Sequence, residues 1–530
     1  MADPVDVDDA DVLTTPSSSS HHHHYYHSQH SPPKAPPPKT VIRALLGLLV
    51  LVNLSWSLYQ LPLNRVIERR LCAEYYLSHD PRVIGGDGSV PEELCKVDEI
   101  QQGLGKLQGG METAWIVGDF IMTIPLVSLV DLYGRRAVLW LNLIPRIALL
   151  FWTFCVGYFH DSLPTNSILV APLFSVLGGD CVFNSIVYAL VASLTDDYVQ
   201  RATYFGQMNA ISSIFAFQLG PALASASMSV LLWLPFWIGI VLLLLAIPTI
   251  SLLPWELGPG VDTHYEERDP LLWSSRRTAK RNRPLRHKIS LKRVMFERVY
   301  NIREILTTHP RNFALLLCGF LLTSLASSDT KLLPQYISKR YEWRFANVGY
   351  LLSGKAVFNF ILLTVIIPAI LKRLRPKHLS PDDDETPFVG RQPQYVKEDA
   401  ANFKYANVCL VFSVLGATAI GLAGSINLLV PSLLLYALGI ALPMFTYSLL
   451  KSPAVSPSTD DETETQIFSI VMLVKTVGLL LGAPLMAALW VQGIGVGGAA
   501  LGLPFFVSAG CYLLAIVVFA GIKLYDPRAV

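Results

Sequence analysis

Apolar residues in this chain fall into blocks of about twenty, the length that an α-helix needs to cross a bilayer core. Polar stretches separate the blocks. Because lipid offers no hydrogen-bond partner to an open backbone, each block predicts a helix. An all-α, polytopic membrane protein of about twelve spans is therefore expected. The predicted spans lie near 41–60, 111–131, 137–158, 165–194, 203–227, 229–253, 312–333, 346–371, 404–424, 427–450, 466–490 and 500–523.

The composition agrees with this pattern and excludes several function classes. The 530 residues are 52% hydrophobic and 15% charged, whereas soluble domains carry about 25% charged residues. A net charge of +2 gives no indication of nucleic-acid binding. The sequence has no P-loop pattern, so we do not expect an ATP-driven pump. The spans contain no His/Glu or Cys/His spacing typical of metal ligands. No metal, cofactor or enzymatic activity is therefore expected.

Basic residues in the connecting segments orient the chain, because short cytoplasmic loops carry an excess of Lys and Arg. The longest basic segment follows the sixth span and divides the spans into two sets of six. It is predicted to be cytoplasmic, as are both termini. The Pro-, Ser- and His-rich beginning of the chain is expected to be disordered. The predicted divisions are a tail 1–40, a six-helix bundle 41–253 with an external loop 61–110, a cytoplasmic loop 254–311, a second six-helix bundle 312–523 and a cytoplasmic end 524–530.

Two of the seven cysteines, Cys72 and Cys95, lie in the predicted external segment 61–110. The outside of a cell is oxidising, so we hypothesise a disulfide between them. Two free thiols are the alternative.

A short charged turn joins the second and third predicted spans. Asp131 lies where one helix is expected to end, and Arg135 and Arg136 lie where the next begins. Gly134 permits the tight reversal between them. Taken alone, the two arginines fit a positive anchor at the cytoplasmic surface.

This turn resembles the loop signature of the major facilitator superfamily, G-x-L-A-D-x-x-G-R-R/K. Asp131, Gly134, Arg135 and Arg136 match, and valine stands where the family usually has its first glycine and its alanine. The resemblance implies two six-helix bundles that transport a solute by alternating access. It also implies that the turn latches the two halves together on the cytoplasmic side. The sequences around Cys72 and Cys95 and over 333–341 resemble a fungal branch with multidrug and metabolite efflux members.

Ionisable residues at membrane depth are functional candidates, because they are costly there. Asp119, Arg146 and Asp180 lie mid-span in the first half. At about 1.5 Å of rise per residue, they fall within one to two helical turns of the same depth. We hypothesise an Asp–Arg–Asp cluster that faces the central cavity and couples transport to protons. A static salt bridge that orders the bundle is the alternative.

The second half carries Lys355 and Lys475 within its spans. Both are too central to reach the interface easily, and they are candidates for binding an anionic group on the substrate. Asp329 and Lys331 lie near the outer end of their span and are interpreted as interfacial.

Gly220 and Pro221 lie in the fifth predicted span among small residues. Small residues let helices approach closely, and proline bends a helix. The stretch partly resembles the antiporter motif of the superfamily, g-x-x-x-G-P-x-x-G-G. The arginine that proton antiporters of the family carry in the fourth span is absent, and Val176 stands in its place.

The leading hypothesis is a secondary transporter that exports a small organic solute, such as a metabolite or xenobiotic, in exchange for protons. Proton-coupled uptake of a nutrient and a non-transporting membrane sensor on the same fold are the alternatives. The expected partners are a small-molecule substrate, protons and membrane lipid. We expect a monomer in the plasma membrane, with the vacuolar membrane as the alternative location.

Overall fold

The computed structural model describes most of the predicted membrane-embedded part of the chain. The predicted tail up to residue 37, the central loop 254–310 and the end from residue 523 lie outside the described residues. The described residues are 38–85, 90–133, 135–159, 162–175, 220–253, 311–366, 392–450 and 461–522, with isolated residues and pairs between 178 and 219.

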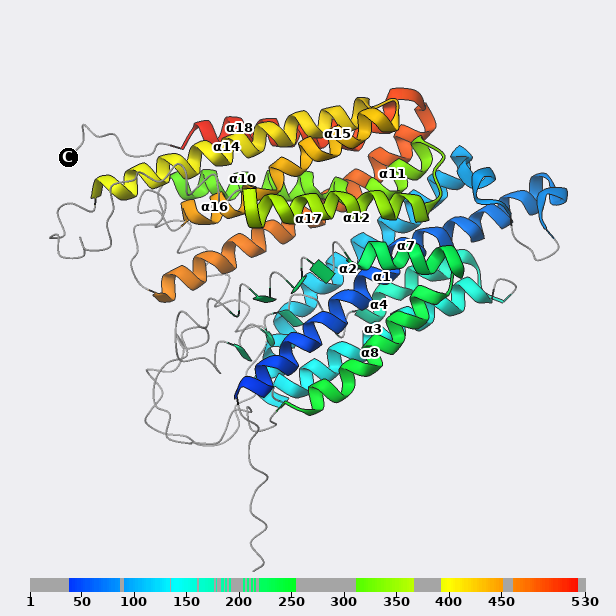
Figure 1. Cartoon of the computed structure of the whole chain (residues 1–530), viewed down its shortest axis with the longest axis horizontal. Coiled ribbons are helices and arrows are strands. Elements are labelled where there is room, and N and C mark those ends of the chain that lie inside the picture. The colour runs from blue at the N-terminus through cyan, green and yellow to red at the C-terminus, as the bar shows by residue number, and fades with distance from the viewer. Residues whose placement is uncertain are drawn as a thin grey trace, which may run out of the picture.

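Helices form the described part of the N-terminal half (Figure 1). Its last long helix shows why the sequence folds this way, because α8 is apolar throughout and begins with a proline in its first turn, where the missing N–H costs nothing. The elements are α1 (Pro38–His79), η1 (Pro81–Val83), η2 (Glu92–Lys96), α2 (Asp98–Tyr133), α3 (Arg135–Tyr158), η3 (Thr165–Val170), α4 (Ala171–Ser175), α7 (Gly220–Val230) and α8 (Leu234–Ser251).

The described residues of the C-terminal half are also helical, and short 3₁₀ or π turns interrupt several of its spans. The elements are α10 (Arg311–Ser327), η5 (Ser328–Lys331), α11 (Leu333–Arg340), α12 (Phe345–Ile361), the π-helical η6 (Leu362–Ile366), α14 (Gln392–Leu422), α15 (Ile426–Ala437), η8 (Leu438–Ala441), α16 (Leu442–Leu450), α17 (Asp461–Val496), η9 (Gly498–Gly502) and α18 (Leu503–Ala520).

Within the described part of the chain, eight helical segments are long and apolar enough to cross a membrane. The helix ends differ from the prediction at the 61–110 segment, which was expected to be a loop. Residues 61–79 continue α1, and residues 98–110 belong to α2, so only 80–97 connects the two helices. The 42 residues of α1 span about 60 Å, about twice the hydrocarbon thickness. Hydropathy detects only the part of such a helix that lies in lipid.

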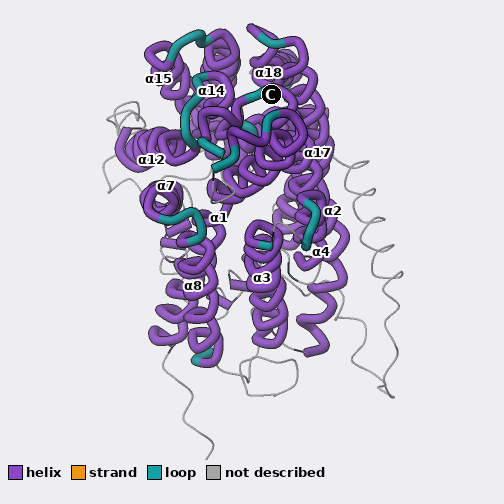
Figure 2. Tube along the Cα trace, turned by 90° about the vertical axis from the view of Figure 1, so that its right-hand side faces the viewer, coloured by secondary structure: helices purple, strands orange, loops and turns teal. Residues whose placement is uncertain are grey.

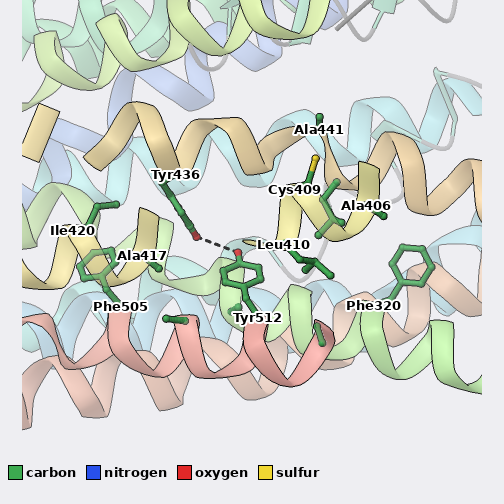
Figure 3. Close-up of a cluster of buried hydrophobic side chains, with 14 of the residues drawn as sticks. Phe320, Ala406, Cys409, Leu410, Ala417, Ile420, Tyr436, Ala441, Phe505 and Tyr512 are labelled. Atoms are coloured by element: carbon green, nitrogen blue, oxygen red, sulfur yellow. Dashed lines mark hydrogen bonds between the residues drawn. The ribbon is translucent and has the colours of Figure 1, made fainter. Parts of the chain in front are cut away.

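Each half has its own hydrophobic core. One cluster of buried residues is drawn from 41–253 with Phe345 added, and another from 313–522. Phe236 anchors the first, and Phe505 and Trp490 anchor the second; all three are at most 1% exposed. Figure 3 shows part of the second core, with Phe505 near Ile420 and Ala417, and Tyr436 facing Tyr512. The apolar packing is thus mainly within the halves.

The halves meet along two lines of helices, α2 against α17 and α7 against α12 (Figures 1 and 2). Glycines allow the close approach. A Cβ added at Gly109 of α2 would lie 2.3 Å from the Cβ of Ala487 in α17. A Cβ added at Gly349 of α12 would lie 1.9 Å from the hydroxyl oxygen of Ser225 in α7. The bundles come together towards the end that carries residues 80–97, which we call the 80–97 end (Figure 1).

Candidate functional site

Arg146 is buried in the middle of α3, with 5% of its surface exposed. Its Nε donates a hydrogen bond of 2.8 Å to Oδ1 of Asn142, one turn earlier in the helix. The guanidinium lies 5.8 Å from the ring centroid of Trp56 in α1 and 5.4 Å from that of Phe183. These are cation–π distances. The site in the N-terminal half is therefore built around a buried cation that lies against two aromatic rings.

Trp56 connects Arg146 to the second helix. Its ring centroid lies 4.5 Å from that of Trp115 in α2, and Asp119 follows Trp115 by one helical turn on the same face. The Asp119 side chain is half-buried. Asp180, the third member of the predicted cluster, lies outside the described residues. The structure therefore brings α1, α2 and α3 together around Trp56, and the three-residue proton-coupling cluster stays a prediction.

The C-terminal half buries a carboxylate that the sequence analysis placed at the membrane interface. Asp329 in η5 is 0% exposed, and the interfacial interpretation is wrong. The hydroxyl of Tyr436 donates to both of its oxygens, at 3.0 and 3.2 Å. The hydroxyls of Tyr436 and Tyr512 lie 3.1 Å apart (Figure 3). Helix α10 ends at Ser327, and the tighter 3₁₀ turn that follows carries Asp329 into the bundle.

Both predicted lysines of the C-terminal half lie against tyrosine rings. The Lys355 ammonium in α12 is 5.5 Å from the ring centroid of Tyr436. The Lys475 ammonium in α17 is 5.4 Å from that of Tyr447 and donates a 2.9 Å hydrogen bond to its hydroxyl. Among the described residues, no carboxylate lies within 4.0 Å of either ammonium. Lys475 thus has no carboxylate partner among the described residues, whereas Lys355 interacts electrostatically with Asp329, which contacts the same Tyr436.

The predicted cytoplasmic latch is described only in part. Asp131 lies in the last turn of α2, Gly134 is outside the described residues, and Arg135 and Arg136 begin α3. An Nη of Arg136 donates to the carbonyl of Leu253, 3.3 Å away, just beyond the end of α8. This contact lies within the N-terminal half. Basic side chains commonly satisfy the last carbonyls of a helix in this way. The latch between the halves stays a prediction.

The antiporter-like pair Gly220 and Pro221 begins α7. A Cβ added at Gly220 would lie 2.1 Å from the hydroxyl oxygen of Ser57, so α7 packs directly on α1. Ser225, one turn later, is the residue that meets Gly349 of the other half. The small residues of this segment therefore serve two close contacts, one within the N-terminal half and one between the halves.

The hypothesised disulfide is confirmed. Cys72 of α1 and Cys95 of η2 are bonded, with their Cα atoms 5.4 Å apart. The charged residues around the bond were not singled out from the sequence: Glu68 is 0% exposed and Lys96 only 6%. For Glu68 a signal existed, because Arg65, Glu68 and Cys72 follow helical spacing. For Lys96 the only signal was its position next to Cys95.

Comparison with known proteins identifies the architecture. The sequence model described as Major Facilitator Superfamily matches residues 96–381. The chain is 26% identical over 478 residues to the MFS efflux pump atnC of Emericella nidulans, covering 90% of this chain and 86% of that protein. It is 22% identical over 490 residues to the efflux pump ustT of Aspergillus flavus, covering 90% and 87%.

Solved structures agree on the fold. The nucleoside transporter NupG superposes with a TM-score of 0.56 at 13% identity, over 92% of this chain and 100% of its own. The human organic anion transporter MFSD10 superposes with a TM-score of 0.51 at 17% identity, over 91% and 100%. The predicted all-α fold of two six-helix bundles is confirmed, and the protein is a multi-pass membrane transporter. The chain belongs to the Major Facilitator Superfamily, in a branch with fungal efflux pumps.

Proposed function

We propose that this transporter exports a small organic solute with an anionic group by alternating access, in exchange for protons. The 80–97 end faces the outside of the membrane, as its disulfide favours. The plasma membrane is the proposed location, and the working unit is a monomer.

The observation that carries the proposal is the placement of cations in both halves. Arg146, Lys355 and Lys475 each lie within a helix and against an aromatic ring. A cation at membrane depth is costly unless it has a partner. Lys355 has the buried Asp329 nearby, on the same Tyr436, whereas Lys475 has no described carboxylate within 4.0 Å. An anionic group on the solute supplies that partner. The aromatic rings beside the cations supply flat apolar surface for the rest of the molecule.

The direction of transport rests on the relatives, since atnC and ustT are both named efflux pumps. Proton coupling rests on Asp119, a carboxylate in α2 that lies one turn from Trp115 and so near the Arg146 cluster. A carboxylate at membrane depth can carry a proton across when the cavity alternates between the two sides. The partial antiporter-like segment at Gly220 and Pro221 is compatible with exchange.

Transport by the purified full chain in sealed vesicles tests the proposal. An imposed pH gradient and a panel of organic anions, cations and neutral solutes are used. We expect movement of anionic members that stops when the gradient is collapsed and when Asp119 is replaced by Asn. Asp80→Asn is the matched control, because Asp80 is exposed and asparagine keeps its capping contact with the backbone of Arg82.

The outcomes separate the parts of the proposal. Movement that ignores the gradient and survives Asp119→Asn would contradict proton coupling. Movement of cations or neutral solutes alone would contradict the role of Lys355 and Lys475. No movement across the whole panel would favour a sensor.

A further inference from the structure

Lys96 lies at the centre of the polar contacts at the 80–97 end. Its ammonium donates to Oε1 of Glu68 at 2.7 Å, to the hydroxyl of Ser338 at 2.7 Å and to Oε1 of Glu92 at 3.5 Å. Three acceptors match the three protons of an ammonium. Lys96 is 6% exposed and Glu68 is 0% exposed, so this charge pair is buried. The ring centroid of Phe345 lies 4.7 Å from the same nitrogen.

These contacts cross between the halves. Ser338 belongs to α11 of the C-terminal half, whereas Glu68 and Lys96 belong to the N-terminal half. The Lys339 ammonium donates to the carbonyl of Lys96 and pairs with Asp98 at 2.5 Å. The backbone N–H of Phe345 donates to Oε1 of Glu92 at 2.8 Å. The five residues of η2 therefore receive hydrogen bonds from α11 and from the start of α12.

The disulfide explains how so short an element keeps its place. A 3₁₀ helix of this length has little stability of its own. Cys95 immediately precedes Lys96, and its partner Cys72 lies one turn beyond Glu68 on the same face of α1. Bonding Cys95 to Cys72 therefore holds Lys96 over Glu68. The bond acts as an anchor that fixes η2 to the N-terminal half.

We propose that Lys96, anchored by the Cys72–Cys95 disulfide, is the outer gate residue of this transporter. The inference rests on the proposed alternating access. Breaking a buried charge pair costs more than exchanging a hydroxyl acceptor for water. Lys96 therefore stays on Glu68 in both states, and the gate opens where Ser338 and Lys339 leave η2. The structure holds the gate closed.

Accessibility of a buried reporter cysteine tests the gate without any substrate. Ala487 in α17 is 8% exposed and packs against Gly109 of the other half, so Ala487→Cys reports separation of the halves. The full chain is placed in lipid nanodiscs, and the rate of labelling by a water-soluble maleimide is measured. The background replaces the cysteines outside the disulfide by alanine, namely Cys155, Cys181, Cys318, Cys409 and Cys511.

Ser338→Ala removes the acceptor on the far side of the gate, and we expect labelling about tenfold faster, as for loss of one hydrogen bond to a charged group. Ser413→Ala is the matched control. Ser413 is also buried, at 3% exposed, and donates to a backbone carbonyl, that of Cys409 in its own helix. Ser338 likewise donates to a backbone carbonyl, that of Trp343 just beyond the end of α11, and in addition accepts from Lys96. Labelling in the control should stay unchanged.

Cys72→Ala/Cys95→Ala should also raise labelling, because η2 is no longer fixed over Glu68. Unchanged labelling in folded Ser338→Ala protein would overturn the proposal, as would an equal rise in Ser413→Ala. If the disulfide-free variant does not fold, Ser338→Ala decides alone. Failure of proton-coupled export would leave these rates untouched, whereas failure of the gate would leave transport of the panel solutes intact, so the two results are distinguishable.

Discussion

The interior of each half and the interface between the halves are built from different chemistry. Inside the C-terminal half, the ring of Phe505 lies 4.8 Å from that of Tyr336, and both residues are at most 1% exposed. Between the halves, the contacts are close-packed glycines and charged pairs. Lys331 meets Glu112 at 2.9 Å, and Arg344 meets Glu93 at 2.6 Å.

This difference indicates which contacts persist when the protein changes state. A packed aromatic core has no substitute in lipid or water and loses its dispersion contacts when it is opened. A partly exposed ion pair loses little, since water replaces each partner. The halves are therefore expected to move as rigid bodies that separate along their polar, glycine-lined contacts.

The largest expected effect is loss of core packing. Phe505→Ala should lower the free energy of unfolding by about 3 kcal/mol, the lower end of the range for such truncations. The lower end is expected because an apolar side chain exposed to lipid loses less than one exposed to water. Thermal unfolding of the purified chain in detergent measures the change. Val517→Ala, at a position 64% exposed, is the control and should unfold at the parent temperature. Equal effects at both positions would contradict the contrast between core and surface.

Removal of the buried cation at the gate comes next. Lys96→Met leaves Glu68 buried without its main partner, and such losses cost about 3 kcal/mol or more. Arg65, which contacts the other carboxylate oxygen at 2.9 Å, remains and should keep the loss near the lower limit. The melting temperature measures the loss. Adding Glu68→Gln to the Lys96→Met protein should restore most of the lost melting temperature. Failure of the double variant to recover would show that packing, and not charge, holds Lys96.

A smaller loss of stability is expected from overpacking the interface between the halves. Gly109→Val places a side chain where Ala487 of the other half already stands, and overpacking of this kind costs about 1–3 kcal/mol. Under the proposed alternating access, the change should favour the open state instead of unfolding the protein. Labelling of a cysteine in place of Ser225, which packs against Gly349 of the other half, should rise. Gly47→Val, where an added Cβ meets nothing within 4 Å, should leave labelling unchanged, and a rise there would contradict the interpretation.

The sequence predicts the helices well and the contacts between them poorly, for a physical reason. Lipid forces an apolar block such as 234–251 to be helical, so hydropathy alone locates α8. The contact of Lys96 with Ser338 joins residues 242 positions apart, and no periodicity encodes such a pair. Asp329 was placed at the interface because a 3₁₀ turn after α10 cannot be read from apolar residues. The disulfide was predictable because the expected external segment contained only Cys72 and Cys95.

An exposed ion pair across the interface, Glu93 with Arg344, should respond to acid. The Glu93 carboxylate accepts hydrogen bonds from its own backbone N–H and from Arg344, and these hold the pKa of Glu93 below its ordinary value of 4.5. A lowered folded pKa means that the contribution of Glu93 to closure is complete above that ordinary value. The contribution is lost as pH falls through the lowered pKa. Near neutral pH, the ion pair of Glu93 with Arg344 therefore makes its full contribution to closing the interface, and that contribution is small.

Glu93→Gln removes the charge of Glu93 alone and leaves the other carboxylates of the gate unchanged, so it measures the contribution of Glu93 to closure. At neutral pH the variant should label slightly faster than the parent at a cysteine in place of Ala487. As the pH is lowered, the parent should approach the variant until the two rates coincide, because a protonated Glu93 and a glutamine carry the same charge. Arg344→Gln should behave as Glu93→Gln does at neutral pH. A difference between parent and Glu93→Gln that persists unchanged in acid would mean that the charge of Glu93 has no part in closing the interface. The contacts of Phe345 with Glu92 and Lys96 would then hold η2 and α12 together.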